Sequence, residues 1–251
     1  MLSQFPFVGD RCRIWTLLGI LTLISSVGCA QTSWNGQVDR WGSLREVLKE
    51  GDTSGKIDLR FLRGRSFHAV GALAELQGEI AVVDGLVRVS IGDAAIHRRG
   101  RHGDEAAFLV AARVREWDVE SLPSPFDLEE LVDWVRLRLS NSPWPDARIV
   151  PIRIQGEMEF EGHVLAGYCP HASARPPEGA QAPLKLNYDG VATIIGFYSD
   201  LPPGEVAHHG SSFHLHAVSK IDGEWVVSHV DQLQINAGAE LSLPAGAAES
   251  R

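Results

Sequence analysis

The chain has 251 residues, of which 44% are hydrophobic and 22% are charged, with 25 glycines and 13 prolines. This composition is typical of a globular protein and excludes a disordered or fibrous chain. The formal charge of −9 and the lack of a periodic lysine or arginine face in the sequence argue against nucleic acid as a partner.

The start of the chain has the pattern of an export signal. Arg11 and Arg13 precede an apolar run that ends at Gly28-Cys29 and is followed by small and polar residues. The run is shorter than the roughly 20 residues that a membrane-spanning helix needs. We therefore predict a signal peptide over residues 1–28, a tether over residues 29–38, and an exported protein that is either a cell-envelope lipoprotein or secreted.

Cys29 is the candidate lipidation site. It follows Ser26-Val27-Gly28, which resembles the lipobox of bacterial lipoproteins, although a lipobox usually has leucine where Ser26 stands. Secretion without a lipid and an uncleaved anchor are the alternatives. A lipid at Cys29 would be the only contact with the membrane, and mass spectrometry that found this cysteine unmodified would contradict the prediction.

Local signals predict mainly β-structure over residues 39–145. Residues 67–92 predict a meander, because turn signals at Gln77-Gly78 and Asp84-Gly85 separate apolar runs. Short strands joined by tight turns of this kind are typical of antiparallel sheets.

Two helices interrupt this pattern. A short helix is predicted to begin at Ser43, its N-cap, and to end at Gly51. An amphipathic helix is predicted from its N-cap Ser124 to Ser140, lying on a sheet, because its apolar residues recur at helical spacing. The following stretch NSPWPD, residues 141–146, breaks the chain and predicts the boundary between two halves.

The second half, residues 146–251, is predicted to carry the metal site. Its expected elements are a hairpin about Gln155-Gly156, a loop over residues 170–183, a buried strand over 190–200, a loop over 201–212 and a final strand over 232–243. The predicted class is α+β, with two β-sheet-rich halves, few helices, antiparallel or mixed sheets, and a metal site on a C-terminal β-hairpin.

That hairpin is FHLHAVSKIDGEWVVSHV, residues 213–230. Asp222-Gly223 is a favoured two-residue type I′ turn between segments rich in valine, isoleucine and tryptophan. If the residues that flank the turn pair with each other, His216 lies directly opposite His229. His214 shares their face, because side chains along a strand repeat with a period of two.

Three imidazoles on one face of a hairpin favour a metal site. Opposed Cβ atoms lie about 4.5 to 5.5 Å apart, which lets ring nitrogens converge on one zinc ion at about 2.0 to 2.1 Å. Three histidines without a fourth protein ligand leave positions for water or substrate, as in a catalytic site. The alternative is a set of polar or locally hydrogen-bonded histidines. His208-His209 in the preceding loop are a candidate extra ligand, although a histidine pair in a polar loop is usually solvated.

In chain order, several segments resemble α-acetolactate decarboxylase, a family that converts 2-hydroxy-2-methyl-3-oxobutanoate to acetoin and carbon dioxide. They are SLREVLKEG, VGALAELQGEIAVVDG, RIQGEMEF, ATIIGFYSD and GSSFHLHAVSKIDGEWVVSHV. The resemblance spans about residues 38–244, and its most specific part is Phe-His-Leu-His with the hairpin and His-Val that follow. It implies a zinc ion with His214, His216 and His229 as ligands.

The resemblance also gives Glu79 a role beside the metal, and we predict that this glutamate handles a proton. Glu157 and Glu224 likewise follow a tight turn, so the position of Glu79 also has a purely local explanation. The family carries a second active-site glutamate in a C-terminal extension, which neither Glu240 nor Glu249 matches by position.

The substrate-binding arginine of the family matches Gly162-His163-Val164, where this sequence has no arginine. Arg153 is our candidate replacement, because it lies on the same predicted hairpin. Arg175 and His163 are alternatives, and a surface role for Arg153 is the simpler interpretation.

These features predict zinc-dependent decarboxylation of 2-acetolactate, a small hydroxy-keto acid, to acetoin and carbon dioxide. The alternative is an envelope-anchored lipoprotein that binds zinc or a hydroxy acid and has lost the reaction. A homodimer is compatible with the sequence. The histidines outside the predicted site are expected to be surface or locally hydrogen-bonded residues: His68, His97, His102 and His171.

Overall fold

The computed structural model describes residues 33–92, 96–172, 176, 178, 180–208 and 210–246. Residues 31–251 form one compact unit. The predicted leader, the lipidation site Cys29 and the candidates Arg175 and His209 lie outside the described residues. Within the described ranges, no helix has both the length and the apolar character that a membrane span requires.

The first sheet of the described chain has seven antiparallel strands in the order β1-β7-β3-β4-β5-β6, with β2 also paired to β7. The strands are β1 (Val38–Trp41), β2 (Ile57–Asp58), β3 (Phe67–Leu73), β4 (Gly78–Val83), β5 (Leu86–Ile91), β6 (Ile96–Arg99) and β7 (Glu105–Arg113). Asp84 and Gly85, with φ of 51° and 73°, form the turn between β4 and β5. The predicted meander is therefore confirmed.

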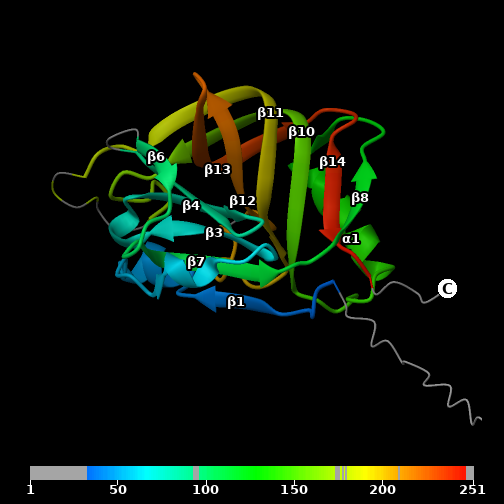
Figure 1. The fold of residues 1–251 in the computed structure, drawn as a ribbon, viewed down its shortest axis with the longest axis horizontal. Helices are drawn as coiled ribbons and strands as arrows, with labels where there is room; N and C mark the ends of the chain where they lie inside the picture. The colour runs from blue at the N-terminus through cyan, green and yellow to red at the C-terminus, as the bar shows by residue number, and fades with distance from the viewer. Residues whose placement is uncertain are drawn as a thin grey trace, which may run out of the picture. The chain divides into compact units, whose positions relative to one another are not determined.

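The second sheet has the order β8-β14-β10-β11-β12-β13-β9. The strands are β8 (Trp117–Ser121), β9 (Phe126–Asp127), β10 (Ile149–Val164), β11 (Leu184–Ser199), β12 (Phe213–Ile221), β13 (Glu224–Ile235) and β14 (Glu240–Pro244). β13 also pairs with β10, so β10, β11, β12 and β13 close into a ring of strands (Figure 1). The antiparallel sheets and few helices confirm the predicted α+β class.

The predicted division into subdomains at residues 145 and 146 stays a prediction. The strands themselves change from the first sheet to the second between β7 and β8, and both sheets belong to one compact unit.

Two predictions for the second half are wrong. β10 runs straight through Gln155-Gly156, paired with β11 along its whole length, so there is no hairpin there. Gly156 has φ of 145°, and a Cβ at this position would lie 2.8 Å from Ala239 in the turn before β14. Glycine is needed here for a close approach of two segments, not for a reversal of the chain. Residues 232–243 form the end of β13, a turn and β14, not one strand.

The short N-terminal helix lies where it was predicted. A single π-helical turn covers Glu46–Glu50. Ser43 Oγ accepts a hydrogen bond from the N–H of Glu46 at 3.1 Å, and Gly51 ends the turn with φ of 72°. Serine at the start and a left-handed glycine at the end are the expected helix boundaries.

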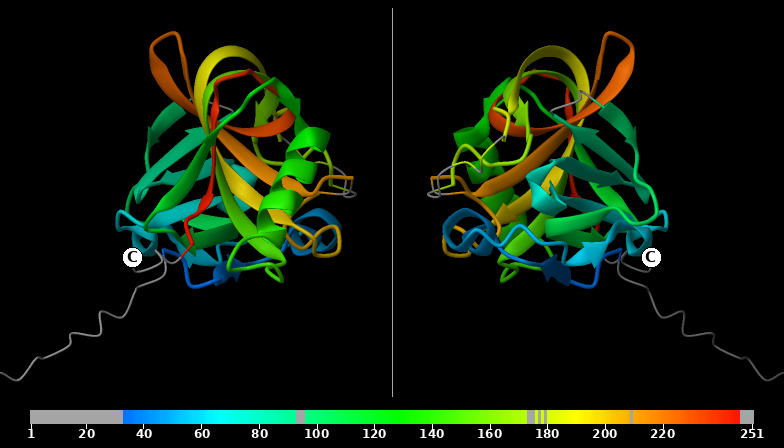
Figure 2. Two further views of the ribbon diagram at one scale, coloured as in Figure 1. Left: turned by 90° about the vertical axis from the view of Figure 1, so that its right-hand side faces the viewer. Right: turned by 90° about the vertical axis from the view of Figure 1, so that its left-hand side faces the viewer.

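Helix α1 (Leu128–Ser140) begins later than predicted, because its N-cap is Asp127 and not Ser124. The Asp127 carboxylate accepts the N–H groups of Glu129 and Glu130 at 2.8 and 2.9 Å. The carboxylate of Glu130 in turn accepts the N–H of Asp127 at 2.9 Å, which completes a capping box. In Figure 2 the green helix stands against the strands of the second sheet. Its buried residues are Leu131, Val135 and Leu139.

We expect Asp127→Ala to lower the free energy of unfolding by about 1 kcal/mol, because two N–H groups of the first helical turn lose their acceptor. Ser124→Ala is the matched control and is expected to change stability by less than about 0.5 kcal/mol, since Ser124 makes no cap. Urea unfolding of both variants measures the difference. Equal losses would contradict the assignment of the cap.

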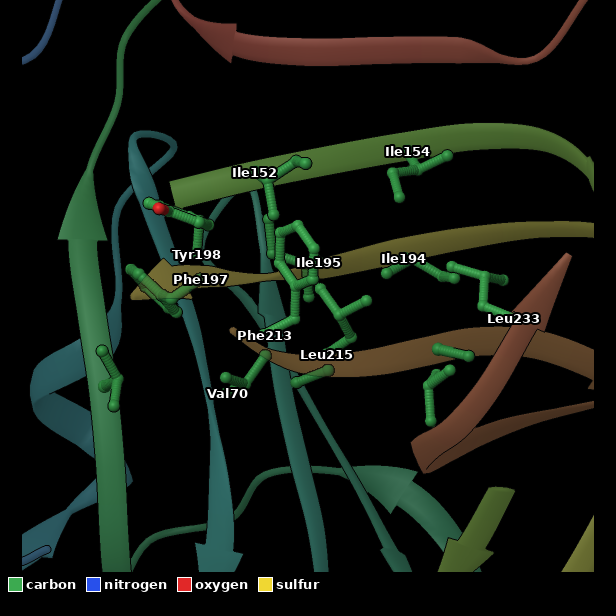
Figure 3. Close-up of a cluster of buried hydrophobic side chains, with 14 of the residues drawn as sticks. Val70, Ile152, Ile154, Ile194, Ile195, Phe197, Tyr198, Phe213, Leu215 and Leu233 are labelled. Carbon is green, nitrogen blue, oxygen red and sulfur yellow. The ribbon is translucent and has the colours of Figure 1, made fainter. Parts of the chain in front are cut away.

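The two sheets pack face to face around one hydrophobic cluster, to which Val70 of the first sheet and Ile195 and Leu215 of the second contribute. Figure 3 shows these side chains with Ile152 and Phe213 between the strands. In Figure 1, β3, β4 and β7 lie below β12 and β13, and β4 contacts both β12 and β13. A second cluster covers the other face of the first sheet. Polar side chains between the sheets are therefore shielded from water.

Candidate metal centre

The hairpin of β12 and β13 has the predicted register. Asp222 and Gly223 have φ of 51° and 87°, as a type I′ turn needs, and His216 pairs with His229. Ring centroids lie 5.0 Å apart for His214 and His216, 5.3 Å for His214 and His229, and 5.6 Å for His216 and His229. The predicted register and convergence are confirmed, while the role of the three rings as metal ligands stays a prediction.

Each of the three rings is held through its Nδ1 atom. His214 Nδ1 lies 2.8 Å from the carbonyl oxygen of Val206, and His216 Nδ1 lies 2.8 Å from that of Ile80. His229 Nδ1 lies 3.1 Å from a carboxylate oxygen of Asp231. These oxygens only accept hydrogen bonds, so each Nδ1 carries the hydrogen and each neutral ring keeps a lone pair on Nε2.

The Nε2 atoms of the three rings are left for a cation. His214 Nε2 and His216 Nε2 lie 3.0 Å apart, and His229 Nε2 is buried without a hydrogen-bond partner. Burial lowers the pKa of His214 to about 3 and of His229 to about 4, and it lowers the pKa of His216 well below its ordinary value. The three rings are therefore neutral at neutral pH, and the lone pairs of His214 and His216 face one another. A divalent ion removes this repulsion, and imidazole nitrogen is a preferred zinc ligand.

The position of His214 depends on close contacts with both sheets. Its ring stacks on Phe108 of β7, with centroids 5.3 Å apart. Gly196 of β11 pairs with Leu215, and a Cβ on Gly196 would lie 2.1 Å from the carbonyl oxygen of His214. The backbone beside this ring therefore has no room for a side chain.

We expect Gly196→Ala to destabilise the fold by about 1 to 3 kcal/mol, because β11 and β12 must move apart at His214. Gly223→Asn is the control, since nothing lies within 4 Å of a Cβ at Gly223 and asparagine tolerates positive φ. Thermal and urea unfolding measure both effects. A stable Gly196→Ala protein with unchanged metal affinity would contradict this prediction.

Glu79 lies beside the histidines, as predicted. The side chain is on β4, is 2% exposed, and places Oε2 3.5 Å from His216 Nε2. Burial raises its pKa to about 8. Glu224, which follows the turn of the β12–β13 hairpin, and Glu157, which lies within β10 after Gly156, are both exposed. The local explanation for a glutamate at this position therefore does not account for the burial of Glu79.

His163 and Asp231 complete a polar network beside the three histidines. The period of two along the strand places Asp231 on the face of the histidines, but the sequence did not predict its contact with His163. His163 Nδ1 lies 2.8 Å from Asp231 Oδ2, and the His163 and His229 rings are 4.9 Å apart. Burial disfavours the charged ring of His163, but the hydrogen bond to Asp231 and the charge of Glu79 outweigh it and raise its pKa. Burial also opposes ionisation of Asp231, but bonds from His163 and His229 hold its pKa well below the ordinary value.

His163 reaches the site because β10 pairs with β13, which places it directly opposite His229. This is also where the family resemblance implies an arginine. The neighbouring Gly162 cannot carry a side chain in this backbone, since a Cβ there would lie 2.2 Å from the carbonyl oxygen of His229. Of the two alternatives for the arginine within the described residues, Arg153 and His163, His163 lies among the histidines.

Two further histidines lie next to this network. His208 is half-buried, and its ring centroid is 5.2 Å from that of His229 and 4.9 Å from that of His171. His208 Nδ1 is buried without a hydrogen-bond partner. The interpretation of His208 as a solvated loop residue is therefore wrong, whereas His171 is exposed, as expected, and lies next to His208 and Asp231.

Two cavities meet at the histidines. An inner cavity of about 30 Å³ is bordered by Glu79 and His214, which is room for about one ion and one water-sized ligand, since a water needs roughly 10 to 15 Å³ on this measure. An outer cavity of about 640 Å³ opens beyond it. His163, His208 and His229 line both. A small molecule in the outer cavity can therefore reach the Nε2 side of the cluster.

Arg153 is not part of this arrangement. Its guanidinium carbon lies 5.0 Å from the centre of the Trp117 ring, and β10 and β12 are separated by β11, which places their backbones roughly 9 to 10 Å apart. Its role in substrate binding stays a prediction. His68, expected at the surface or locally hydrogen-bonded, is fully buried against Trp117. Neither of its ring nitrogens has a hydrogen-bond partner among the described residues, although Nε2 lies 3.6 Å from the Asp84 carboxylate, so that expectation is wrong.

By sequence, no protein family and no curated protein matches the chain. Its structure is similar to acetolactate decarboxylase from Bacillus subtilis subspecies spizizenii, with a TM-score of 0.64 and 19% identity over 83% of this chain and 85% of that chain. The α-acetolactate decarboxylase of Bacillus subtilis strain 168 gives a TM-score of 0.62 and 18% identity over 84% and 86%.

A third similar structure is a Staphylococcus aureus protein of unknown function described as similar to α-acetolactate decarboxylase. It gives a TM-score of 0.57 and 13% identity over 82% of this chain and 84% of that chain. The chain therefore has the fold of the acetolactate decarboxylases, in a divergent form.

Proposed function

We propose that this chain is a decarboxylase that converts 2-acetolactate to acetoin and carbon dioxide with a zinc ion held by His214, His216 and His229. The observation that carries the proposal is the convergence of the three rings, with centroids 5.0 to 5.6 Å apart and each ring anchored through its Nδ1 atom. The fold shared with acetolactate decarboxylases supports the same activity.

Loss of carbon dioxide from a β-keto acid leaves an electron pair that must be stabilised. When bound, a divalent cation supplies this stabilisation as a Lewis acid toward the hydroxyl and keto oxygens of the substrate. The residues of the chain supply the rest of the site: the anchored histidines, a buried acid and walls that exclude water.

Glu79 is the group that we assign to proton delivery. Burial raises its pKa to about 8, so the metal-free protein holds a proton on this carboxyl at neutral pH. The carbon that loses carbon dioxide must take up one proton to give acetoin, and Glu79 borders the inner cavity where that carbon would lie. A general acid in this position contributes about a hundredfold to ten-thousandfold in rate.

The cavities suggest how the substrate is placed. The inner cavity of about 30 Å³ accommodates the reacting oxygens but not the whole of a nine-atom acid. The remainder must extend past His163, His208 and His229 into the outer cavity. His163, held by Asp231, is one of the three histidines that a group at the junction of the two cavities would meet.

The test is turnover of acetolactate by the purified, zinc-loaded protein, with zinc content measured on the same sample. We expect acetoin to form faster than in the protein-free buffer, where acetolactate decarboxylates spontaneously. Zinc bound at the site with no acetoin above the spontaneous rate would reject the decarboxylase.

That negative result would support the second candidate, a protein that binds zinc or a hydroxy acid without turnover. One observation favours it: among the described residues, no arginine lines either cavity. A carboxylate substrate would then lack the bidentate partner that guanidinium provides. Tight binding of a hydroxy acid without product would identify this function.

Export is part of both candidates. We propose that the leader is removed and that Cys29 is the lipidated first residue of an envelope protein, on the sequence pattern alone. Detection of an unmodified Cys29 in the mature chain by mass spectrometry would reject the lipid anchor and leave the secreted form.

A further inference from the structure

A second cluster of ligand-type side chains lies on the outer-cavity side of His229. It consists of His163, His171, His208 and Asp231, which we call the outer set. All four line the outer cavity. They come from β10, from β13 and from the two segments that follow β10 and β11, so four separate parts of the chain deliver them to one place.

The distances within the outer set are those of groups that can share an ion. His163 Nδ1 lies 2.8 Å from one oxygen of Asp231, and His171 Nε2 lies 3.9 Å from the other. The first contact is a hydrogen bond in the metal-free protein, so a cation bound by both groups would displace the proton of His163 Nδ1. Ligand atoms on one zinc ion lie roughly 3 Å apart when the bonds are about 2.0 to 2.2 Å. The ligand atoms of His163, His229 and Asp231 also lie within 4.8 Å of one another.

His208 provides an independent observation. Its Nδ1 is buried without a hydrogen-bond partner, although its ring is within 5.2 Å of His229 and 4.9 Å of His171. A buried imidazole nitrogen that bonds to nothing costs free energy unless another group satisfies it. A cation bound by the neighbouring imidazoles and carboxylate would satisfy the His208 nitrogen, because imidazole nitrogen is a metal ligand.

We propose that the chain binds a second divalent cation on the outer set, separate from the ion on His214, His216 and His229. His229 stands between the two places, with Nε2 on the inner side and Nδ1 toward Asp231. The inference goes beyond the proposed function, which needs one cation. Because the outer set faces the larger cavity, this ion would take an anionic oxygen ligand, such as a carboxylate, from that cavity.

A simpler role for part of the outer set is to hold His229. Asp231 does this through its bond to Nδ1 of His229, and such bonds orient metal-ligating histidines in many sites. That role does not involve His171, because its side chain lies against Asp231, His163 and His208. Substitution of His171 therefore distinguishes a second cation site from side chains that only orient His229.

The experiment counts zinc ions per chain by equilibrium dialysis of chelator-stripped protein, followed by elemental analysis. We expect two equivalents for the wild type and one for His171→Ala. The His171 side chain is 50% exposed, so its loss is expected to leave the fold intact. His102→Ala is the matched control, since His102 is an exposed histidine that contacts Arg60, and it is expected to keep two equivalents.

Two further variants locate each ion. His216→Ala is expected to keep the outer equivalent and lose the inner one. Asp231→Asn is expected to lose the outer equivalent and to bind the inner one about tenfold to a hundredfold more weakly. Circular dichroism of each variant confirms folding before zinc is counted.

A wild-type protein that saturates at one equivalent would overturn the second site. So would a His171→Ala protein that binds two equivalents with wild-type affinity. Two equivalents without acetoin formation would support this inference and reject the decarboxylase, whereas one equivalent with acetoin formation would do the reverse.

Discussion

Replacement of His216 with alanine is expected to remove the inner zinc ion and reduce acetoin formation to the spontaneous rate. His216 is fully buried, its Nδ1 is anchored by the Ile80 carbonyl, and its Nε2 lies 3.0 Å from that of His214. Loss of one ligand leaves two nitrogens, which is too few for a three-ligand catalytic zinc site. A Lewis acid worth several kcal/mol corresponds to at least about a thousandfold in kcat/KM.

The measurement combines the rate of acetoin formation with the zinc content of the variant. His102→Ala is the control for the loss of a histidine as such and is expected to behave like the wild type. Wild-type acetoin formation by a folded His216→Ala protein would show that His216 is not a ligand of the catalytic ion.

Replacement of Glu79 with glutamine is expected to reduce kcat by about a hundredfold to ten-thousandfold while zinc stays bound, because the amide cannot deliver the proton. Glu157→Gln is a closely matched control. Glu157, like Glu79, follows a Gln-Gly pair in the sequence, but it is exposed and lies outside the site. Equal activity of Glu79→Gln and the wild type would remove Glu79 from the proton step.

The same substitution also changes the pH dependence of stability in the metal-free protein. The pKa of Glu79 is about 8 when folded, against 4.5 for the ordinary carboxyl. Between these values the folded state holds a proton that the unfolded state has lost. The free energy of unfolding therefore falls as pH rises, by about 1.4 kcal/mol per unit for one group.

The buried rings of His208, His214 and His229 have the opposite sign, unlike His163, whose pKa is raised. Their folded pKa values lie below the ordinary 6.5, so protonation of the unfolded chain removes stability as pH falls below 6.5. Between pH 6.5 and 8 the effect of Glu79 remains. Over this window the free energy of unfolding of the wild type is expected to fall by about 2 kcal/mol, and that of Glu79→Gln is expected not to show this loss. Urea unfolding at several pH values measures this. Parallel pH profiles for the two proteins would contradict a raised pKa at Glu79.

The errors at Gly156 and Ser124 have a common cause: the same residue type is compatible with more than one local structure. Gly156 follows glutamine as in a turn, yet it lies within β10 because Ala239 packs against it. Ser124 is as good an N-cap as Asp127, but β9 occupies residues 126 and 127 and pairs with β13, so the helix begins after it. In both cases a partner distant in the chain decided between two locally acceptable structures.

The site shows the same distinction. The alignment of His214, His216 and His229 follows from one local turn and the two-residue period of a strand, so it can be derived from eighteen consecutive residues. Glu79 was found only through resemblance, because nothing local distinguishes it from Glu157 or Glu224. Its burial comes from the packing of β4 against β12 and β13.

The contact between His163 and Asp231 follows neither from a local sequence pattern nor from the family resemblance. They meet because β13 returns to β10 and closes the ring of strands, a pairing between segments more than sixty residues apart. Short-range side-chain periodicity specifies how a strand presents its faces, but strand order depends on which surfaces exclude water together. The amino-acid pattern therefore determined the three-histidine hairpin and placed Asp231 two residues after His229 on the same face of the strand. Tertiary packing alone decided which buried acid and which further imidazoles surround it.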